Sequence, residues 1–156
     1  LDTQELEGLY PKAAFLDSRE VVLFGEKGFV LYQADSKKIE TQENFESEIN
    51  SVFCTNQKLG FIFKNEDDNG KYRMEIYNKA GKKSSTYYFD LDYSGMTADD
   101  DEVILYNDEE MLIYQMGGRV RFRGTFNTAV TGVMPSWEDG LYWLIDDQSL
   151  REIRIR

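Results

Sequence analysis

A short pattern centred on a small residue recurs four times along the chain. It reads LEGL at 6–9, INSV at 49–52, YSGM at 93–96 and VTGV at 130–133. The spacings are 43 (6 to 49), 44 (49 to 93) and 37 (93 to 130) residues. A period of this length indicates a repeat protein in which each copy is one supersecondary unit. The repeat therefore constrains the fold more than any single motif does.

Each copy also contains a dense apolar run that predicts a strand. The runs are EVVLF at 20–24, LGFIF at 59–63, EVILY at 102–106 and GLYWLI at 140–145. They are short, rich in β-branched and aromatic residues and bounded by turn residues, as strands are. Because the apolar residues are continuous rather than alternating, both faces of these strands are expected to be buried.

A hydrophobic residue followed by tyrosine marks the next strand in three copies. The pairs are Leu31-Tyr32, Ile76-Tyr77 and Ile113-Tyr114. Each pair is followed by a polar stretch, QADSKK, NKAGKK or QMGGRV, which predicts a turn. The segments after the turns, such as KIETQENF and VRFRGTF, mix polar and apolar positions, which is typical of a partly exposed outer strand.

Four strands per copy at a period of about 40 residues predict the blades of a β-propeller. The expected units are 6–48, 49–92, 93–129 and 130–156, within one domain over residues 1–156. The recurring pattern is assigned to the inner strand, where its small residue lets neighbouring blades approach closely. That residue is Gly8, Ser51, Gly95 or Gly132. The predicted fold class is therefore all-β, with four four-stranded propeller repeats, the last of which lacks its outer strand.

One segment also fits a helix. Phe45, Ile49 and Val52 stand at i, i+4 and i+7, so TQENFESEI could form a short amphipathic helix over 41–48. The equivalent segments TYYFDLDYSGM and TFNTAVTGVM carry the same spacing in residues that favour strands. We therefore assign strand throughout and keep the helix as the alternative.

The missing outer strand of the last copy leaves two expectations. Residues 1–5 could supply it by pairing with Leu150–Arg156, since propellers close their rings in this way and unpaired edges invite aggregation. The alternative, favoured because the chain starts at Leu1 and not at methionine, is that the chain is the C-terminal part of a larger propeller. The open edge at Leu150–Arg156 also predicts self-association with a second copy.

The segment FVLYQADSKKIE and its looser copy MEIYNKAGKKSS resemble the blade repeats of quinoprotein-like and WD40-like propellers. The chain also resembles uncharacterised bacterial propeller domains that are anchored outside the cell membrane, which implies an extracytoplasmic location. The tryptophan that docks blades in the quinone-dependent enzymes has no equivalent in the outer strands, so no cofactor is expected.

Composition excludes several functions. The chain carries 18 basic and 29 acidic residues, a net charge of -11, and has no basic stripe, which argues against nucleic acid as a partner. No window approaches the roughly 18 consecutive apolar residues of a membrane helix, so no membrane contact is expected of this segment. The lone Cys54 permits no intramolecular disulfide and is expected to be a buried thiol. The chain has no histidine, the most common general base and metal ligand.

The segment SWEDGLYW is a candidate catalytic loop. It resembles the Asp-box of sialidase-type propellers, with Glu138 in place of the aspartate, but it occurs once and at a different turn, which favours coincidence. In a glycosidase, Glu138 and Asp139 would be the acid and the base. Exposed aromatic residues could instead bind sugar or protein. These are Tyr10, Tyr87, Tyr88 and Trp137.

Two acidic segments are candidate cation sites. NEDDNGKY places oxygen-bearing side chains at Asn65, Asp67 and Asn69, as in the first half of a calcium-binding loop. Ile76 stands where a carboxylate would be needed, and an Asn-Gly hairpin turn explains the same residues. ADDDE at 98–102 is expected to be a solvated loop.

The sequence thus predicts a non-enzymatic binding or scaffold module, built from propeller blades, for a protein or glycan partner. The alternative function is a glycosidase-like propeller enzyme that uses loop carboxylates.

Overall fold

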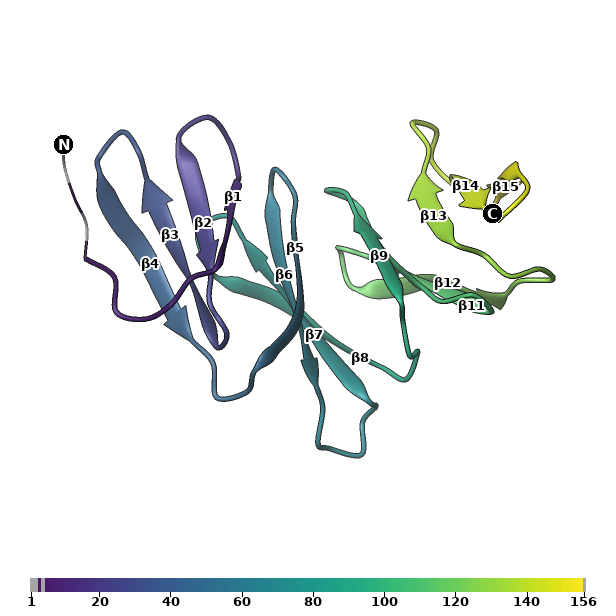
Figure 1. The fold of residues 1–156 in the computed structure, drawn as a ribbon, viewed down its shortest axis with the longest axis horizontal. Coiled ribbons are helices and arrows are strands. Elements are labelled where there is room, and N and C mark those ends of the chain that lie inside the picture. The colour runs from purple at the N-terminus through teal and green to yellow at the C-terminus, as the bar shows by residue number, and fades with distance from the viewer. Residues whose placement is uncertain (1–2, 4, 156) are drawn as a thin grey trace. The chain divides into compact units, whose positions relative to one another are not determined.

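The computed structural model describes residue 3 and residues 5–155, and every regular element among them is a β-strand (Figure 1). The strands form four antiparallel sheets, of which three have four strands and the last has three. The predicted all-β fold with an incomplete last repeat is confirmed. Each sheet pairs its strands in chain order, so every connection within a sheet joins neighbouring strands.

Residues 1–89 form one compact unit with two sheets. The first sheet consists of β1 (Lys12–Phe15), β2 (Glu20–Phe24), β3 (Gly28–Gln33) and β4 (Lys38–Asn44). The second consists of β5 (Ile49–Cys54), β6 (Lys58–Lys64), β7 (Tyr72–Asn78) and β8 (Lys83–Phe89). Their shared core is a cluster of buried aromatic and aliphatic side chains from both sheets, which holds the sheets together.

Residues 90–156 form the second compact unit. Its first sheet consists of β9 (Gly95–Ala98), β10 (Glu102–Tyr106), β11 (Glu110–Gln115) and β12 (Arg119–Thr125). Its second sheet consists of β13 (Gly132–Pro135), β14 (Leu141–Ile145) and β15 (Leu150–Arg154). A separate core cluster joins these two sheets. Each expected repeat contains one sheet, whereas the assignment of the whole chain to a single domain stays a prediction.

The recurring hydrophobic-Tyr pair marks an irregularity in the sheet. The pairing of the third strand with the outer strand shifts register between Leu31 and Tyr32, and at the matching place between Ile76 and Tyr77. The third copy shifts between Ile113 and Tyr114. Bulges of this kind bend a strand and increase its twist. The repeat in sequence therefore encodes the same bend in three sheets.

The prediction that the first copy of the recurring pattern, LEGL, lies on an inner strand is wrong. LEGL precedes the first strand, which begins at Lys12, and Gly8 lies in a bend with a φ of 120°. In the third and fourth copies the glycine makes room within its own sheet rather than between blades. A Cβ on Gly95 would lie 2.2 Å from the ring of Tyr106, its cross-strand partner, and one on Gly132 would meet Ile145.

The helix alternative at 41–48 is wrong. Strand β4 continues to Asn44, and the chain then bends before β5 begins at Ile49. The assignment of strand throughout this segment is also corrected, because residues 45–48 form the connection. Phe45 instead packs its ring against the core, 5.1 Å from the ring of Phe61.

Burial of the apolar strands follows the prediction in most of the chain. Strands β6 and β10 are buried over nearly their whole length, whereas β2 alternates because Val21 and Leu23 are only half-buried. The outer strands are polar and largely exposed, as expected. Cys54 is half-buried and packs against the core, so it is less enclosed than predicted.

The expected pairing of residues 1–5 with Leu150–Arg156 falls largely outside the described residues, because residues 1, 2, 4 and 156 are not among them. The ring closure therefore stays a prediction. In the described part of the chain no helix has the length and hydrophobicity to cross a membrane.

Candidate functional site

The turn between the first and second strands carries the same side-chain cap in three sheets. Asp17 Oδ1 accepts a hydrogen bond from the backbone N–H of Glu20 at 3.0 Å, and Asp99 Oδ1 accepts one from Glu102 at 2.9 Å. Thr55 caps the equivalent turn of the second sheet. Such turns fix the chain just before a strand begins. The ADDDE segment is thus a capped turn that delivers Glu102 to the start of β10.

The first residue of the second strand is a buried glutamate in two sheets. Glu20 is 5% exposed and Glu102 is 6% exposed. Burial raises the pKa of both carboxyl groups above the ordinary value, because the charged form loses its hydration. The two positions are equivalent in the repeat, since EVVLF and EVILY begin with the same residue.

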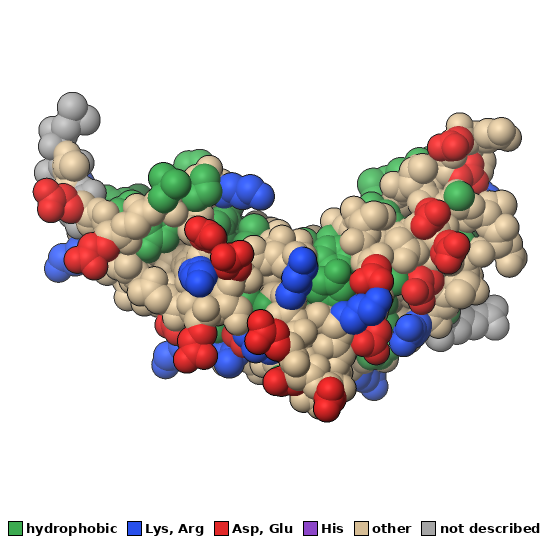
Figure 2. All heavy atoms as spheres, turned by 60° about the horizontal axis from the view of Figure 1, so that its bottom comes forward, with side chains coloured by type: hydrophobic (Ala, Val, Ile, Leu, Met, Phe, Trp, Pro, Cys, Tyr) green, Lys and Arg blue, Asp and Glu red, His purple; other side chains and the backbone are tan. Residues whose placement is uncertain are grey.

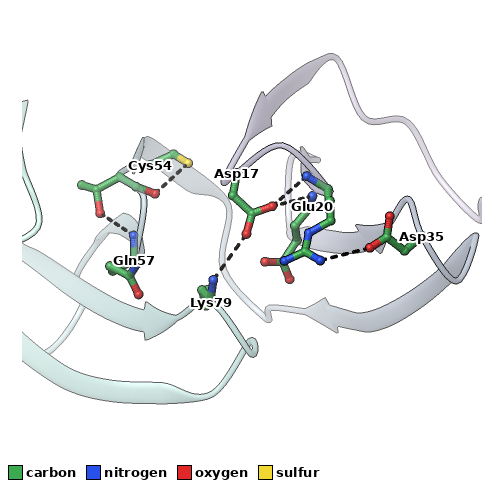
Figure 3. A network of polar contacts seen from close by, with 8 residues as sticks. Asp17, Glu20, Asp35, Cys54, Gln57 and Lys79 are labelled. Atoms are coloured by element: carbon green, nitrogen blue, oxygen red, sulfur yellow. Dashed lines mark hydrogen bonds and ion pairs between the residues drawn. The ribbon is translucent and has the colours of Figure 1, made fainter.

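Around Glu20, polar contacts link the two sheets of the first unit (Figure 3). Lys79, in the turn that follows β7, forms an ion pair with Asp17 Oδ2 at 3.4 Å. Arg19 forms a further ion pair with Asp35 at 3.3 Å within the first sheet. The backbone N–H of Arg19 is the largest influence that lowers the pKa of Asp17, and Lys79 adds to it. The network therefore ties one sheet to the next.

Around Glu102, a tighter network links the two sheets of the second unit. Its Oε2 accepts hydrogen bonds from the hydroxyl of Tyr142, at 2.9 Å, and from Arg121 Nη1, at 3.2 Å. Arg121 Nη1 also lies 2.6 Å from Asp139 Oδ1. The hydrogen bond with Asp139 raises the pKa of Arg121, and the same bond lowers the pKa of Asp139. Tyr142 belongs to β14, so the network joins the two sheets.

The raised pKa of Glu102 predicts that the stability of the fold depends on pH. Its carboxyl binds a proton more tightly when folded, so its contribution is fully present below pH 4.5 and is lost as pH rises through the raised folded pKa. We expect Glu102→Gln to flatten the fall in the free energy of unfolding between pH 4.5 and neutral pH, measured by urea denaturation. Glu152→Gln, on exposed β15, should leave the slope unchanged. An unaltered slope in Glu102→Gln would contradict this assignment.

The predicted catalytic residues lie together in the loop between β13 and β14, where both are held in ion pairs. Glu138 Oε1 lies 2.7 Å from Arg154 Nη2 on β15, and Asp139 is held by Arg121. Because its pKa is lowered, Asp139 is a poor proton donor near neutral pH. Trp137 in the same loop is 91% exposed. The glycosidase alternative gains no support from this geometry.

The other predicted residues lie in the first unit. Tyr87 and Tyr88 are neighbours on β8, where Tyr88 is 39% exposed and Tyr87 is half-buried. Asn65, Asp67 and Asn69 stand in the connection between β6 and β7. The side-chain amide of Asn65 donates hydrogen bonds to the backbone carbonyls of Asp67 and Gly70, at 3.1 and 2.9 Å, which stabilises the loop itself. The calcium site stays a prediction.

Among the described residues, no group of three or more acidic, cysteine or histidine side chains is arranged to hold a metal ion. Acidic and basic side chains are interspersed over the face shown in Figure 2. Such a distribution lacks the single-sign field that attracts polyanions.

A pocket of about 570 Å³ opens in the first unit beside β1. Four segments form it: the chain leading into β1, the turn between β2 and β3, the end of β4 and the beginning of β5. Its apolar lining residues are Leu9, Tyr10, Pro11, Phe24, Ile49 and Val52. Amide and hydroxyl side chains, together with charges of both signs, complete the wall. Of the aromatic residues predicted for binding, only Tyr10 lies in this pocket.

Tyr10 holds the segment before β1 against the sheet. Its hydroxyl accepts a hydrogen bond from Gln42 Nε2 at 3.2 Å and donates one to the carbonyl of Glu7 at 3.3 Å. A Cβ on Gly25 would lie 3.3 Å from the ring, so the glycine permits this close contact. Leu9, 82% exposed, stands next to this anchor. Apart from Tyr10, no residue of the pocket was predicted from the sequence, because its walls come from segments far apart along the chain.

The solved structures with which the chain aligns are propellers. The chain aligns with BBS1N, solved in complex with ARL6DN, at a TM-score of 0.63 and 13% identity, over 97% of this chain and 53% of that chain. It aligns with Hsv2p of Kluyveromyces lactis at a TM-score of 0.58 and 10% identity, over 93% and 46%. The computationally designed Ika4 protein gives a TM-score of 0.61 and 10% identity, over 99% and 96%.

The four sheets and these likenesses define the chain as a β-propeller protein. It spans about half the length of the BBS1N and Hsv2p chains. The chain belongs to the sequence family described as a family of unknown function, DUF5711, whose match covers residues 4–155. A comparison with curated proteins finds no match.

Proposed function

We propose that this protein is a non-enzymatic binding module that takes an extended segment of a protein partner in the pocket beside β1. The observation that carries the proposal is the pocket itself, whose apolar lining is combined with amide and hydroxyl groups. Such a lining suits a peptide, which offers apolar side chains and backbone hydrogen-bonding groups together. Among the similar structures, BBS1N was solved with a protein partner, which agrees with this role.

The carboxylates predicted as catalytic, together with the buried Glu102, support a binding role over catalysis. Glu138, Asp139 and Glu102 are engaged with cationic or hydroxyl partners, and none of them lines the pocket. A glycosidase would need two carboxylates facing each other across the sugar site. The glycan partner, the relation to quinoprotein-like and WD40-like propellers and the extracytoplasmic location stay predictions.

Selection from a random peptide library displayed on phage tests the proposal. We expect peptides that bind the wild-type chain and bind Leu9→Asp at least about tenfold more weakly, because the substitution places a charge on the apolar wall. Leu9 is 82% exposed, so the variant should fold normally.

The matched control is Val120→Asp, at a half-exposed position on β12 that lies outside the pocket. It should bind the selected peptides as the wild type does. Selected peptides that bind Leu9→Asp with unchanged affinity, or turnover of a glycoside by the purified chain, would contradict the proposed function.

A further inference from the structure

Strand β1 is the edge of the first sheet, and half of its backbone groups point away from that sheet. In the sheet order it pairs only with β2. The N–H of Leu16, which directly follows β1, donates a hydrogen bond to the carbonyl of Glu20 at 2.9 Å, so these residues form a hydrogen-bonded pair. Such pairs alternate with non-hydrogen-bonded ones along an antiparallel ladder. In this register the N–H and C=O groups of Ala13 and Phe15 point to the open edge.

Pro11 agrees with this assignment. It stands two residues before Ala13, so its nitrogen faces the same edge, where a missing N–H costs no ladder hydrogen bond. Ala13 and Phe15 are both exposed, and their backbone groups have no hydrogen-bond partner among the described residues. The edge therefore offers two donors and two acceptors at the spacing of a β-strand.

A groove runs along this edge between β1 and β5. Its volume is about 530 Å³, and it is lined by residues 11–14 and 52–54 together with Phe24. Pro11, Lys12, Phe24 and Val52 also line the pocket beside β1, so the pocket and the groove are continuous. Figure 1 shows β1 and β5 as neighbouring strands of the first unit. All the residues that form the groove belong to this one unit.

The corresponding strands of the second unit are joined to each other. β9 and β13 are the first strands of its two sheets, as β1 and β5 are in the first unit. The hydroxyl of Thr97 on β9 donates a hydrogen bond to the backbone carbonyl of Val133 on β13, at 3.1 Å. No hydrogen bond joins β1 to β5 in the described part of the chain. The groove is therefore a feature of the first unit rather than of the repeat.

We propose that the extended segment of the partner adds to the first sheet as a fifth strand, with its backbone hydrogen-bonded to Ala13 and Phe15. This inference rests on the proposed function and specifies how the same site recognises its partner. Addition of a strand to a sheet edge supplies affinity through backbone hydrogen bonds and specificity through alternate side chains. The segment would continue from this edge into the pocket beside β1.

The side chains around the groove indicate which segment fits. The centre of β1 is formed by Ala13 and Ala14, whose small side chains leave the edge accessible. Alternate side chains of the added strand would enter the groove against Phe24 and Val52. Lys12 is the only charged residue that lines the groove. A segment with alternating apolar side chains, and with no lysine or arginine next to Lys12, is therefore complementary to it.

Methylation of single backbone nitrogens in a selected peptide tests this mode of binding on the wild-type chain. Each N-methyl group removes one hydrogen-bond donor from one side of an extended peptide. We expect methylation at alternate residues of the paired stretch to raise the dissociation constant at least about tenfold, measured by fluorescence polarisation. Methylation at the residues between them should change the affinity little.

Ala13→Pro tests the pairing from the side of the chain. The substitution removes the N–H that faces the open edge and leaves the hydrogen bonds between β1 and β2 in place, as Pro11 does two residues earlier. We expect it to raise the dissociation constant at least about tenfold. The matched control is Ala13→Ser, which keeps the N–H and should bind the peptide as the wild type does. Circular dichroism of both variants checks that they fold.

The pairing and the proposed function fail in different ways. If no selected peptide depends on Leu9, the proposed function fails and the pairing fails with it. If peptides depend on Leu9 but show no alternation on methylation, and bind Ala13→Pro as tightly as Ala13→Ser, the binding module stands and the pairing with β1 is overturned. A wild-type dimer that Ala13→Pro dissociates would also overturn the pairing, because a second copy would then occupy the edge.

Discussion

Replacing Phe61 with alanine is expected to lower the free energy of unfolding of the first unit by about 4 kcal/mol. The Phe61 side chain is fully buried, and its ring lies 4.9 Å from that of Phe29 and 5.4 Å from that of Tyr77. Phe24 and Phe45 also contact it. Removing the ring leaves a cavity between two sheets, and the surrounding rings, held by several partners, can fill it only in part.

Urea denaturation followed by circular dichroism measures this loss. The matched control is Trp137→Ala, which removes an aromatic ring that is 91% exposed and should change the free energy of unfolding by less than about 0.5 kcal/mol. If both substitutions had equal, small effects, the two sheets of the first unit would not be joined by this aromatic cluster.

Adding a single methyl group at Gly60 is expected to cost about 3 kcal/mol. Gly60 pairs with Phe53 across β5 and β6, and a Cβ at this position would lie 1.9 Å from atoms of the phenylalanine ring. Phe53 is 8% exposed, so its ring cannot swing away without disturbing the core. We therefore expect Gly60→Ala to shift the urea midpoint strongly toward lower concentration.

Gly117→Ala is the control for Gly60→Ala, because a Cβ on Gly117 would meet no atom within 4 Å. It should leave the urea midpoint nearly unchanged. If Phe53→Ala in the Gly60→Ala background restored part of the lost stability, the steric cause would be established. Equal midpoints for Gly60→Ala and Gly117→Ala would show that the ring is not packed over this glycine.

The sequence predicts the strands of the repeat correctly where the composition of a short segment is enough to identify them. The apolar runs EVVLF and EVILY coincide with β2 and β10, and the polar outer strands fall where their mixed composition places them. The prediction fails at LEGL, because Gly8 has the spacing of the repeat but the positive φ of a bend. A four-residue pattern is too short to fix the register of a strand on its own.

The polar networks were not predicted from the sequence. The one signal that it offers is that Glu20 and Glu102 open an apolar run at the same place in two repeats. The partner of Glu102 could not be identified, because Tyr142 lies forty residues away and reaches it only through the packing of two sheets. The pocket is harder still to predict from the sequence, because Leu9, Phe24 and Ile49 come together only in the folded unit.

Hydrogen exchange with and without a selected peptide tests the proposed binding site most directly. The account predicts slower exchange on peptide binding in residues 7–12, 24–28 and 49–52, which form the pocket beside β1. Exchange in residues 136–140, the loop that carries Trp137 and Glu138, should stay as it is without peptide. Protection confined to that loop, with no change around the pocket, would contradict the account.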